Sequence, residues 1–262
     1  MITLEELVEM DKSSYKIWLQ KMYSVENGLY HYSGNFHNYH LQKGILDLKN
    51  NNIFLSKNNF SICGLVDEYR IKNFNSRLFD HGLHHISYAI LSDNEEMLQR
   101  YAKLRYERGK NAELSMDEMI NLGELPIWCN TVQFFIANDA KGVERNLNII
   151  ETKTLSNLSK REEGLRDDYE FYKALLTNNK AKMEEILAKL VSPKIHKKRN
   201  DNPLLNKFIS LPALGYAKLA WRKGIEVDID SPLIPKELLP IEPLKEYEIY
   251  YEYIMQSMYL KV

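Results

Sequence analysis

The fold is decided by the stretch LTNNKAKMEEILAKL, from Leu176 to Leu190. It joins an apolar helix end to an amphipathic helix through an Asn-Asn turn, and Asn favours both turns and helix N-caps. The stretches LSDNEEMLQRYAKL (91–104) and IANDAKGVERNLNI (136–149) follow the same plan. Asp93, Asn138 and Asn178 recur at roughly 40-residue spacing, the period of two-helix repeats. The pattern predicts an all-α protein built from antiparallel helical hairpins in a repeat-like array.

Two interpretations of this recurrence are open. Helical hairpins that each need a neighbour to cover an apolar face would produce it, as in repeat proteins. Coincident turn chemistry in an ordinary helical bundle would produce it as well. Both interpretations give an all-α protein, so the fold class does not depend on the choice between them.

The N-terminal part of the chain also carries helix signals. Thr3 followed by Glu6 has the spacing of a capping box, and the break at Asn27-Gly28 predicts the end of a first helix. A second helix is expected from Asn35 to Asn50. We therefore predict an N-terminal helical segment at residues 1–76 and a helical-hairpin domain at residues 77–262, packed together as one unit.

The middle of the chain carries three further boundary signals. The Ser92-Asp93 pair is expected to cap a helix that runs to Gly109. Ser115 with Glu118 repeats the capping-box spacing and predicts another helix start. Because proline disrupts a helix interior, Pro126 predicts either a kink or the first turn of a new helix.

One segment departs from the helical pattern: GIEVDIDSPLIPKELLP, from Gly224 to Pro240. Apolar and acidic residues alternate from Ile225 to Asp230, which indicates extended backbone. Two prolines that follow keep the preceding residues out of the helical region. We expect a short extended Pro-rich segment that acts as a structural strap, one helical turn at PKELL (235–239), and a last helix from about Pro243.

Composition limits the classes of function. The chain has 262 residues, a formal charge of -1, 44% hydrophobic and 27% charged residues, which is ordinary for a soluble domain. No global field favours nucleic acid or an anionic membrane, so neither is expected as a partner. Cys63 and Cys129 have apolar flanks and are expected to be buried thiols. The N-terminus has no signal-peptide core and no apolar run crosses a bilayer, so we expect a cytoplasmic protein.

Three histidines lie close together in HGLHHI (81–86). His81, His84 and His85 include pairs three and four residues apart, which can share a helix face and hold a metal. No Glu lies between them as in the HExxH motif of zinc proteases. We favour packed, hydrogen-bonded histidines, and expect no metal and no cofactor.

Carboxylates are dense at two places. The run REEGLRDDYE (161–170) is typical of a solvated helix start, where acids are favoured by the helix dipole, and a partner-binding patch is the alternative. The chain has no Gly-rich phosphate loop and no GxSxG motif, so we do not expect an enzyme. The candidate partner-binding residues are Glu162, Glu163, Asp167 and Asp168 in that run, and Glu226, Asp228 and Asp230 in the strap.

The C-terminal third resembles a known group of proteins. The stretches FYKALLTNNKAKMEEILAKLVSPK (171–194) and PALGYAKLAWRKGIEVDIDSPLIPKELLP (212–240) are similar to bacterial polymorphic-toxin immunity proteins, above all to the immunity protein 49 family. They are also similar to related families that neutralise PoNe-type nuclease toxins. HHISYAILSDN (84–94) and IWCNTVQFFIANDAKGVERNL (127–147) are consistent with the same group, so the resemblance runs from about Phe79 to Tyr253.

The resemblance implies a small, mostly α-helical and non-catalytic cytoplasmic antitoxin. Such a protein binds a cognate toxin and blocks its active site or an essential surface. If the toxin is a nuclease with a basic cleft, acidic groups of the immunity protein would mimic phosphate and speed association. Two alternatives are a helical-repeat scaffold that binds another protein in a concave groove, and a metal-dependent hydrolase that uses His81, His84 and His85.

Overall fold

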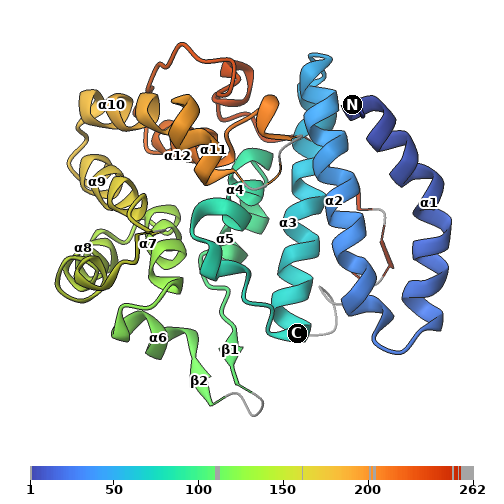
Figure 1. Cartoon of the computed structure of the whole chain (residues 1–262), viewed down its shortest axis with the longest axis horizontal. Coiled ribbons are helices and arrows are strands. Elements are labelled where there is room, and N and C mark those ends of the chain that lie inside the picture. Colours follow the sequence, from blue (N-terminus) through green and yellow to red (C-terminus); the bar gives the residue numbers. More distant parts are fainter. Residues whose placement is uncertain are drawn as a thin grey trace.

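The computed structural model describes residues 2–109, 113–160, 162–200, 202, 205–249, 251, 252 and 254. These residues form twelve α-helices, several short 3-10 or π turns and one pair of two-residue strands. In Figure 1, α1 to α3 lie along one side, α7 to α10 along the other, and α4 and α5 between them. The predicted all-α fold is confirmed. None of the helices described is both long and apolar enough to span a bilayer.

The three N-terminal helices are α1 (Leu4–Ser24), α2 (Gly28–Lys49) and α3 (Ile53–Phe74). The capping box predicted at Thr3 and Glu6 is formed. α2 begins at Gly28 rather than at Asn35, because the chain reverses directly after Asn27. A Cβ atom at residue 28 would lie 2.5 Å from the carbonyl oxygens of Lys21 and Met22, so only glycine fits this reversal.

The helix α3 was not predicted. Every residue from Ser56 to Tyr69 is buried, so these four turns of the helix have no solvent-facing side. A helix that is covered all round lacks the amphipathic stripe on which sequence reasoning depends. It lies at the centre of the molecule, between α2 and α4 (Figure 1).

The same two-residue turn closes four helical hairpins. Its first residue is Asn or Asp in the left-handed conformation, with φ between 54° and 58°. Its second residue caps the next helix, because its side-chain oxygen accepts a hydrogen bond from a backbone N–H in the first turn. The predicted hairpins are therefore confirmed, with one more than expected. The turns are Asn51-Asn52, Asp93-Asn94, Asn138-Asp139 and Asn178-Asn179.

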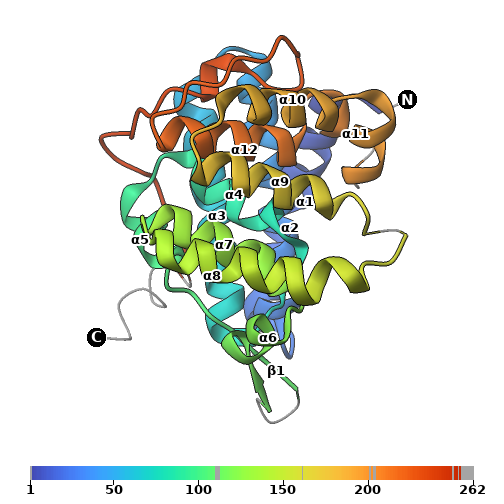
Figure 2. The same cartoon turned by 90° about the vertical axis from the view of Figure 1, so that its left-hand side faces the viewer.

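The hairpins after α2–α3 stack on one another. They are α4 (Leu83–Ser92) with α5 (Glu95–Tyr101), α7 (Pro126–Ile136) with α8 (Ala140–Ile149), and α9 (Leu165–Leu176) with α10 (Lys180–Leu190). In Figure 2, α10, α9, α7 and α8 follow one another down the visible face. α11 (Pro193–Arg199) and α12 (Leu211–Arg222) complete the helices, and α12 packs on α4 and α10.

The region between α5 and α7 differs from its prediction. α5 ends at Tyr101 instead of Gly109, because Gln133 Nε2 on α7 donates hydrogen bonds to the carbonyls of Tyr101 and Leu104. Two short strands follow, β1 (Glu107–Arg108) and β2 (Leu114–Ser115), which pair antiparallel. α6 (Met116–Leu122) begins with the predicted capping box, and Pro126 opens α7 as a new helix.

The strap leaves α12 through Gly224, whose φ is 76°. Residues 225–231 contain no helix, a turn follows at residues 232 and 233, and a single 3-10 turn, Lys236–Leu238, comes next, in the predicted order. The helix expected from about Pro243 does not begin there: residues 241–249 contain no helix, and residues 252 and 254 are helical. The tyrosine-rich residues 255–262 lie outside the described part of the chain.

Side chains from distant helices hold the backbone of this last stretch. Lys218 Nζ donates to the carbonyl of Pro240 at 2.7 Å, and Lys57 Nζ donates to that of Glu242 at 3.0 Å. The N–H of Glu248 donates to Asn58 Oδ1 at 2.9 Å. Because these backbone groups are bonded to side chains, they do not need the internal bonds of a helix.

A buried carboxylate, Asp93, organises these contacts. Its Oδ2 lies 2.9 Å from Lys57 Nζ and 2.8 Å from Lys218 Nζ, and its Oδ1 lies 3.3 Å from Arg222. The side chains of Lys57 and Lys218 are 2% and 0% exposed. Burial lowers the pKa of Lys218 to about 8, and Asp93 partly offsets this effect. We call Asp93, Lys57, Lys218 and Arg222 the Asp93 hub.

The Asp93 hub predicts a large cost for a small change. Asp93→Asn keeps a residue that tolerates the left-handed conformation but removes the negative charge. Because two buried ammonium groups lose their counter-charge, the free energy of unfolding should fall by about 3–5 kcal/mol, measured by urea denaturation. The control Asp230→Asn changes an exposed carboxylate and should alter stability by less than about 0.5 kcal/mol. A loss of under about 1 kcal/mol for Asp93→Asn would contradict the proposed importance of the hub.

A second buried contact ties the C-terminal residues to α2. His40 is 4% exposed; its Nδ1 lies 2.7 Å from Asn59 Oδ1 and its Nε2 lies 2.7 Å from the Tyr251 hydroxyl oxygen. Asn59 Oδ1 accepts a hydrogen bond, so Nδ1 carries the proton of a neutral ring and Nε2 accepts from Tyr251. Burial lowers the pKa of His40 from 6.5 to about 4, which keeps the ring neutral.

This histidine predicts a loss of stability in acid. Between pH 6.5 and about 4 the unfolded chain binds a proton at His40 that the folded chain does not, so stability is full above pH 6.5 and falls toward pH 4. In His40→Gln the decrease in unfolding free energy over this range should be about 3 kcal/mol smaller than in the unmodified chain. Denaturant titrations at several pH values measure both slopes; equal slopes would show that His40 is not the titrating group.

Candidate functional site

A groove runs between the 3-10 turn Leu78–His81, which precedes α4, and the helices α9 and α11. It comprises two adjoining cavities of about 350 Å³ and 300 Å³. Asp80, Leu125 and Glu162 line both of them, so the two cavities lie side by side and share a wall. We call this feature the polar groove; its other ionisable lining residues are Arg77, His81, His84, Arg108, Glu124, Lys153, Asp168, Lys198 and Arg199.

Two exposed leucines line the polar groove. Leu122, at the end of α6, is 59% exposed, and Leu125, just before α7, is 37% exposed. The other strongly exposed large hydrophobic side chains in the described part of the chain all lie between Ile2 and Phe54. The groove therefore has apolar side chains that the described residues leave partly exposed, and such side chains can act as anchors in protein interfaces.

Paired charges surround these leucines. Arg77 lies 2.6 Å from Asp80, and Arg108 lies 2.8 Å from Glu124. Asp80 also accepts a hydrogen bond from Tyr106. Because both signs of charge are present, the groove does not imitate a row of phosphates. An apolar centre with a polar rim is instead the general anatomy of a protein–protein interface.

The predicted carboxylates of the run at residues 161–170 have four different environments. Glu162 lines the polar groove and accepts hydrogen bonds from the backbone and hydroxyl of Ser159. Glu163 is exposed and pairs with Arg166, and Asp167 pairs with Lys189 at 2.6 Å. Asp168 is buried. Of the four, the structure places Glu162 and Asp168 on the lining of the polar groove.

Asp168 forms part of the wall beneath the groove. Its two oxygens lie 2.9 Å and 2.8 Å from one guanidinium nitrogen of Arg199, and the Tyr216 hydroxyl donates to it at 2.6 Å. These contacts join α9, α11 and α12. The carboxylate is therefore occupied inside the protein and not offered to a partner. Sequence reasoning placed it on the surface because its burial depends on Arg199, which is distant in the sequence.

The strap carboxylates are exposed, and they are separate from the first group. Glu226, Asp228 and Asp230 alternate with Val227, which is 1% exposed, as the predicted alternation requires. Asp228 lies 2.6 Å from Lys236. The strap contacts Glu184 of α10, whereas Asp167 contacts Lys189 of the same helix. These two positions on α10 are five residues, or about 140°, apart around the helix axis. The two groups of acids therefore do not form one patch.

The three histidines predicted to lie together have different partners. His84 Nε2 lies 2.9 Å from the Tyr88 hydroxyl, and His81 lines the polar groove. His85 instead faces the buried Asp67, with 2.6 Å between Nδ1 and Oδ2. Packed, hydrogen-bonded histidines are what the sequence favoured, and the trio does not converge on one point.

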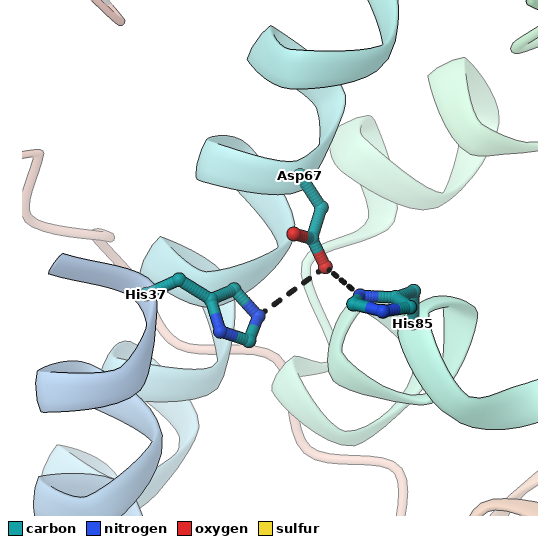
Figure 3. A group of neighbouring side chains, drawn as sticks. All are labelled: His37, Asp67 and His85. Carbon is teal, nitrogen blue, oxygen red and sulfur yellow. Dashed lines mark hydrogen bonds and ion pairs between the residues drawn. The ribbon is translucent and has the colours of Figure 1, made fainter. Parts of the chain in front are cut away.

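A different group does converge: His37 from α2, Asp67 from α3 and His85 from α4 (Figure 3). His37 Nε2 lies 3.3 Å from Asp67 Oδ2. Burial alone would raise the pKa of Asp67, but the two imidazoles together bring it below its usual range. We call this group the His–Asp–His cluster. Sequence reasoning missed it because His37 and Asp67 meet His85 only in the folded chain.

The contrast between Asp168 and Glu163 is testable. Asp168→Asn leaves the guanidinium of Arg199 without its buried counter-charge, so the free energy of unfolding should fall by about 3 kcal/mol. Glu163→Gln, the matched surface change, should cost less than about 0.5 kcal/mol. Guanidinium denaturation measures both. Equal effects would mean that Asp168 is a surface group after all.

Comparison with known proteins identifies the family. The family model described as Immunity protein 49 matches residues 42–238. Comparisons with curated proteins and with solved structures gave no significant match. The matched range contains the polar groove, the strap as far as its 3-10 turn and all four hairpin turns, and it begins earlier than the resemblance seen from about Phe79. The chain belongs to the immunity protein 49 family.

Proposed function

We propose that this protein is a cytoplasmic bacterial antitoxin that binds a cognate secreted toxin and neutralises it by covering its active surface. The family match over residues 42–238 carries the proposal, because membership indicates the role of an immunity protein. In this role the chain acts stoichiometrically and catalyses no reaction. The hydrolase alternative is not proposed, because among the described residues the ligand atoms of His81, His84 and His85 are not grouped as those of His37, Asp67 and His85 are.

The polar groove is the contact surface that we propose. Leu122 and Leu125 are exposed to solvent in the groove. Their burial by a toxin would stabilise the complex in proportion to the apolar area covered. Its lining residues, from Arg77 to Tyr216, all lie inside the range that the family model matches. The exposed apolar residues of α1 lie outside that range. Of the groove and the exposed face of α1, the groove is therefore the one that lies within the range matched by the family model.

The acidic residues have a secondary part in this proposal. Glu162 and Glu163 would lie at the rim of the contact, where charges set orientation more than affinity. Glu226, Asp228 and Asp230 form a row of exposed carboxylates along the strap. Such a row suits the basic cleft of a nuclease, and a nuclease is the kind of toxin that we propose. Asp167 and Asp168 instead form ion pairs within the chain, with Lys189 and Arg199, and these pairs hold α9 in place.

Co-expression tests the proposal directly. The chain is produced in bacteria together with the toxin encoded beside its gene. We expect it to restore growth and to co-purify with the toxin in a fixed ratio. Failure of both rescue and co-purification would contradict the proposed function.

The leucines of the groove predict which surface is used. The double change Leu122→Lys and Leu125→Lys places charge in the apolar centre, and should weaken toxin binding at least about 30-fold, since removal of an interface anchor costs 2 kcal/mol or more. Calorimetry or biolayer interferometry measures the affinity. Ile17→Lys on α1 is the matched control, because Ile17 is 54% exposed but lies outside the matched range. If Ile17→Lys lost binding while the double variant bound fully, the interface would lie on α1 and not in the groove.

A further inference from the structure

The His–Asp–His cluster joins three helices in the interior. One nitrogen from each histidine and one oxygen of Asp67 all lie within 4.8 Å of one another. His37 is 5% exposed and Asp67 is 0% exposed, so the cluster is shielded from bulk water on the sides of α2 and α3. Figure 3 shows both imidazole rings directed at the same carboxylate.

Two polar atoms of the cluster have no hydrogen-bond partner. They are His37 Nε2 and Asp67 Oδ1, and both are buried. His37 Nε2 lies 3.3 Å from Asp67 Oδ2, but the pair does not form a hydrogen bond. Buried polar atoms in native proteins are nearly always satisfied, so a group outside the polypeptide is expected to bond to these two.

The charge of the cluster also requires a partner. Among the described residues, no lysine or arginine pairs with Asp67; its ion-pair partners are the two imidazoles. The next residue, Glu68, is different because it pairs with Lys72 and Arg100. A fully buried carboxylate needs a positive charge nearby to offset the loss of hydration, and here that charge comes from a protonated imidazole or from a bound cation.

We propose that His37, Asp67 and His85 form a binding site for one divalent transition-metal ion of the zinc class. Imidazole nitrogen and carboxylate oxygen are the ligands that zinc prefers, whereas calcium and magnesium prefer oxygen alone. Ligand distances of about 2.0–2.2 Å place the ligand atoms roughly 3.3 Å apart around a tetrahedral ion. His37 Nε2 and Asp67 Oδ2 already have this separation.

Binding changes one contact of the present arrangement. His85 Nδ1–H donates a hydrogen bond to Asp67 Oδ2 at 2.6 Å, so the ion takes the place of this proton, which is released to solvent, and the two atoms move apart. The fourth position is left for a water molecule, which would donate a hydrogen bond to the otherwise unsatisfied Asp67 Oδ1. The side chain of His85 is 16% exposed, which gives the ion a path from solvent. The bound ion would cross-link α2, α3 and α4 and so stabilise the fold without any catalytic step.

Metal titration of the purified, full-length, metal-free protein tests this proposal. We expect one equivalent of Zn²⁺ to bind by calorimetry, and Co²⁺ to give the visible absorption of a four-coordinate ion. Zn²⁺ should also raise the melting temperature. His37→Gln and Asp67→Asn should each weaken Zn²⁺ binding at least about tenfold. Circular dichroism shows whether each variant is folded; His37→Gln keeps the test valid if Asp67→Asn does not fold.

His31→Gln is the matched control, because His31 lies on the same helix and is exposed. It should bind Zn²⁺ as tightly as the unmodified chain. The proposal is overturned if the protein binds neither Zn²⁺ nor Co²⁺. It is equally overturned if folded His37→Gln binds as well as the unmodified chain, since binding would then come from surface histidines.

Discussion

The burial of one carboxylate, Asp93, between two lysines and an arginine is the interaction on which the rest of the structure depends. Charges buried in this way are costly unless each donor and acceptor is used. Here Lys218 also donates to the carbonyl of Pro240 at the end of the strap, and Lys57 donates to that of Glu242 just after it. Asp93 in turn accepts a hydrogen bond from the backbone N–H of Glu242. The hub therefore fixes α3, the α4–α5 turn, α12 and the strap relative to one another.

This constraint positions the proposed contact surface. α12 is held against α4 by the hub, and Pro212 and Tyr216 at its start line the polar groove. The ion pair of Asp168 and Arg199 then fixes α9 and α11 against α12. A groove whose walls are held in this way loses little freedom when a partner binds, which favours affinity. Rigidity and shape of this kind suit the toxin-binding role that we propose.

The features that were predictable from the sequence are those with local causes. The hairpin turns depend on Asn or Asp in a left-handed conformation followed by a cap, and both signals lie within a few residues. The strap follows from alternation and prolines in the same way. The helix α3 was missed because four of its turns are buried all round, and the helix expected from about Pro243 does not begin there because Lys57, Asn58 and Lys218 hold that backbone from a distance. The burial of Asp168 and the convergence of His37, Asp67 and His85 likewise depend on tertiary contacts. The division at residue 76 stays a prediction.

Native-state hydrogen exchange, followed by mass spectrometry at increasing urea concentrations, tests most directly the claim that the Asp93 hub joins residues 1–76 and 77–262 into one cooperative unit. If the claim holds, the slowest amides of α3 and α12 open with the same free energy and the same dependence on urea, because they unfold together. Exchange of α1 to α3 at a clearly lower free energy, while α4 to α12 stay protected, would contradict it.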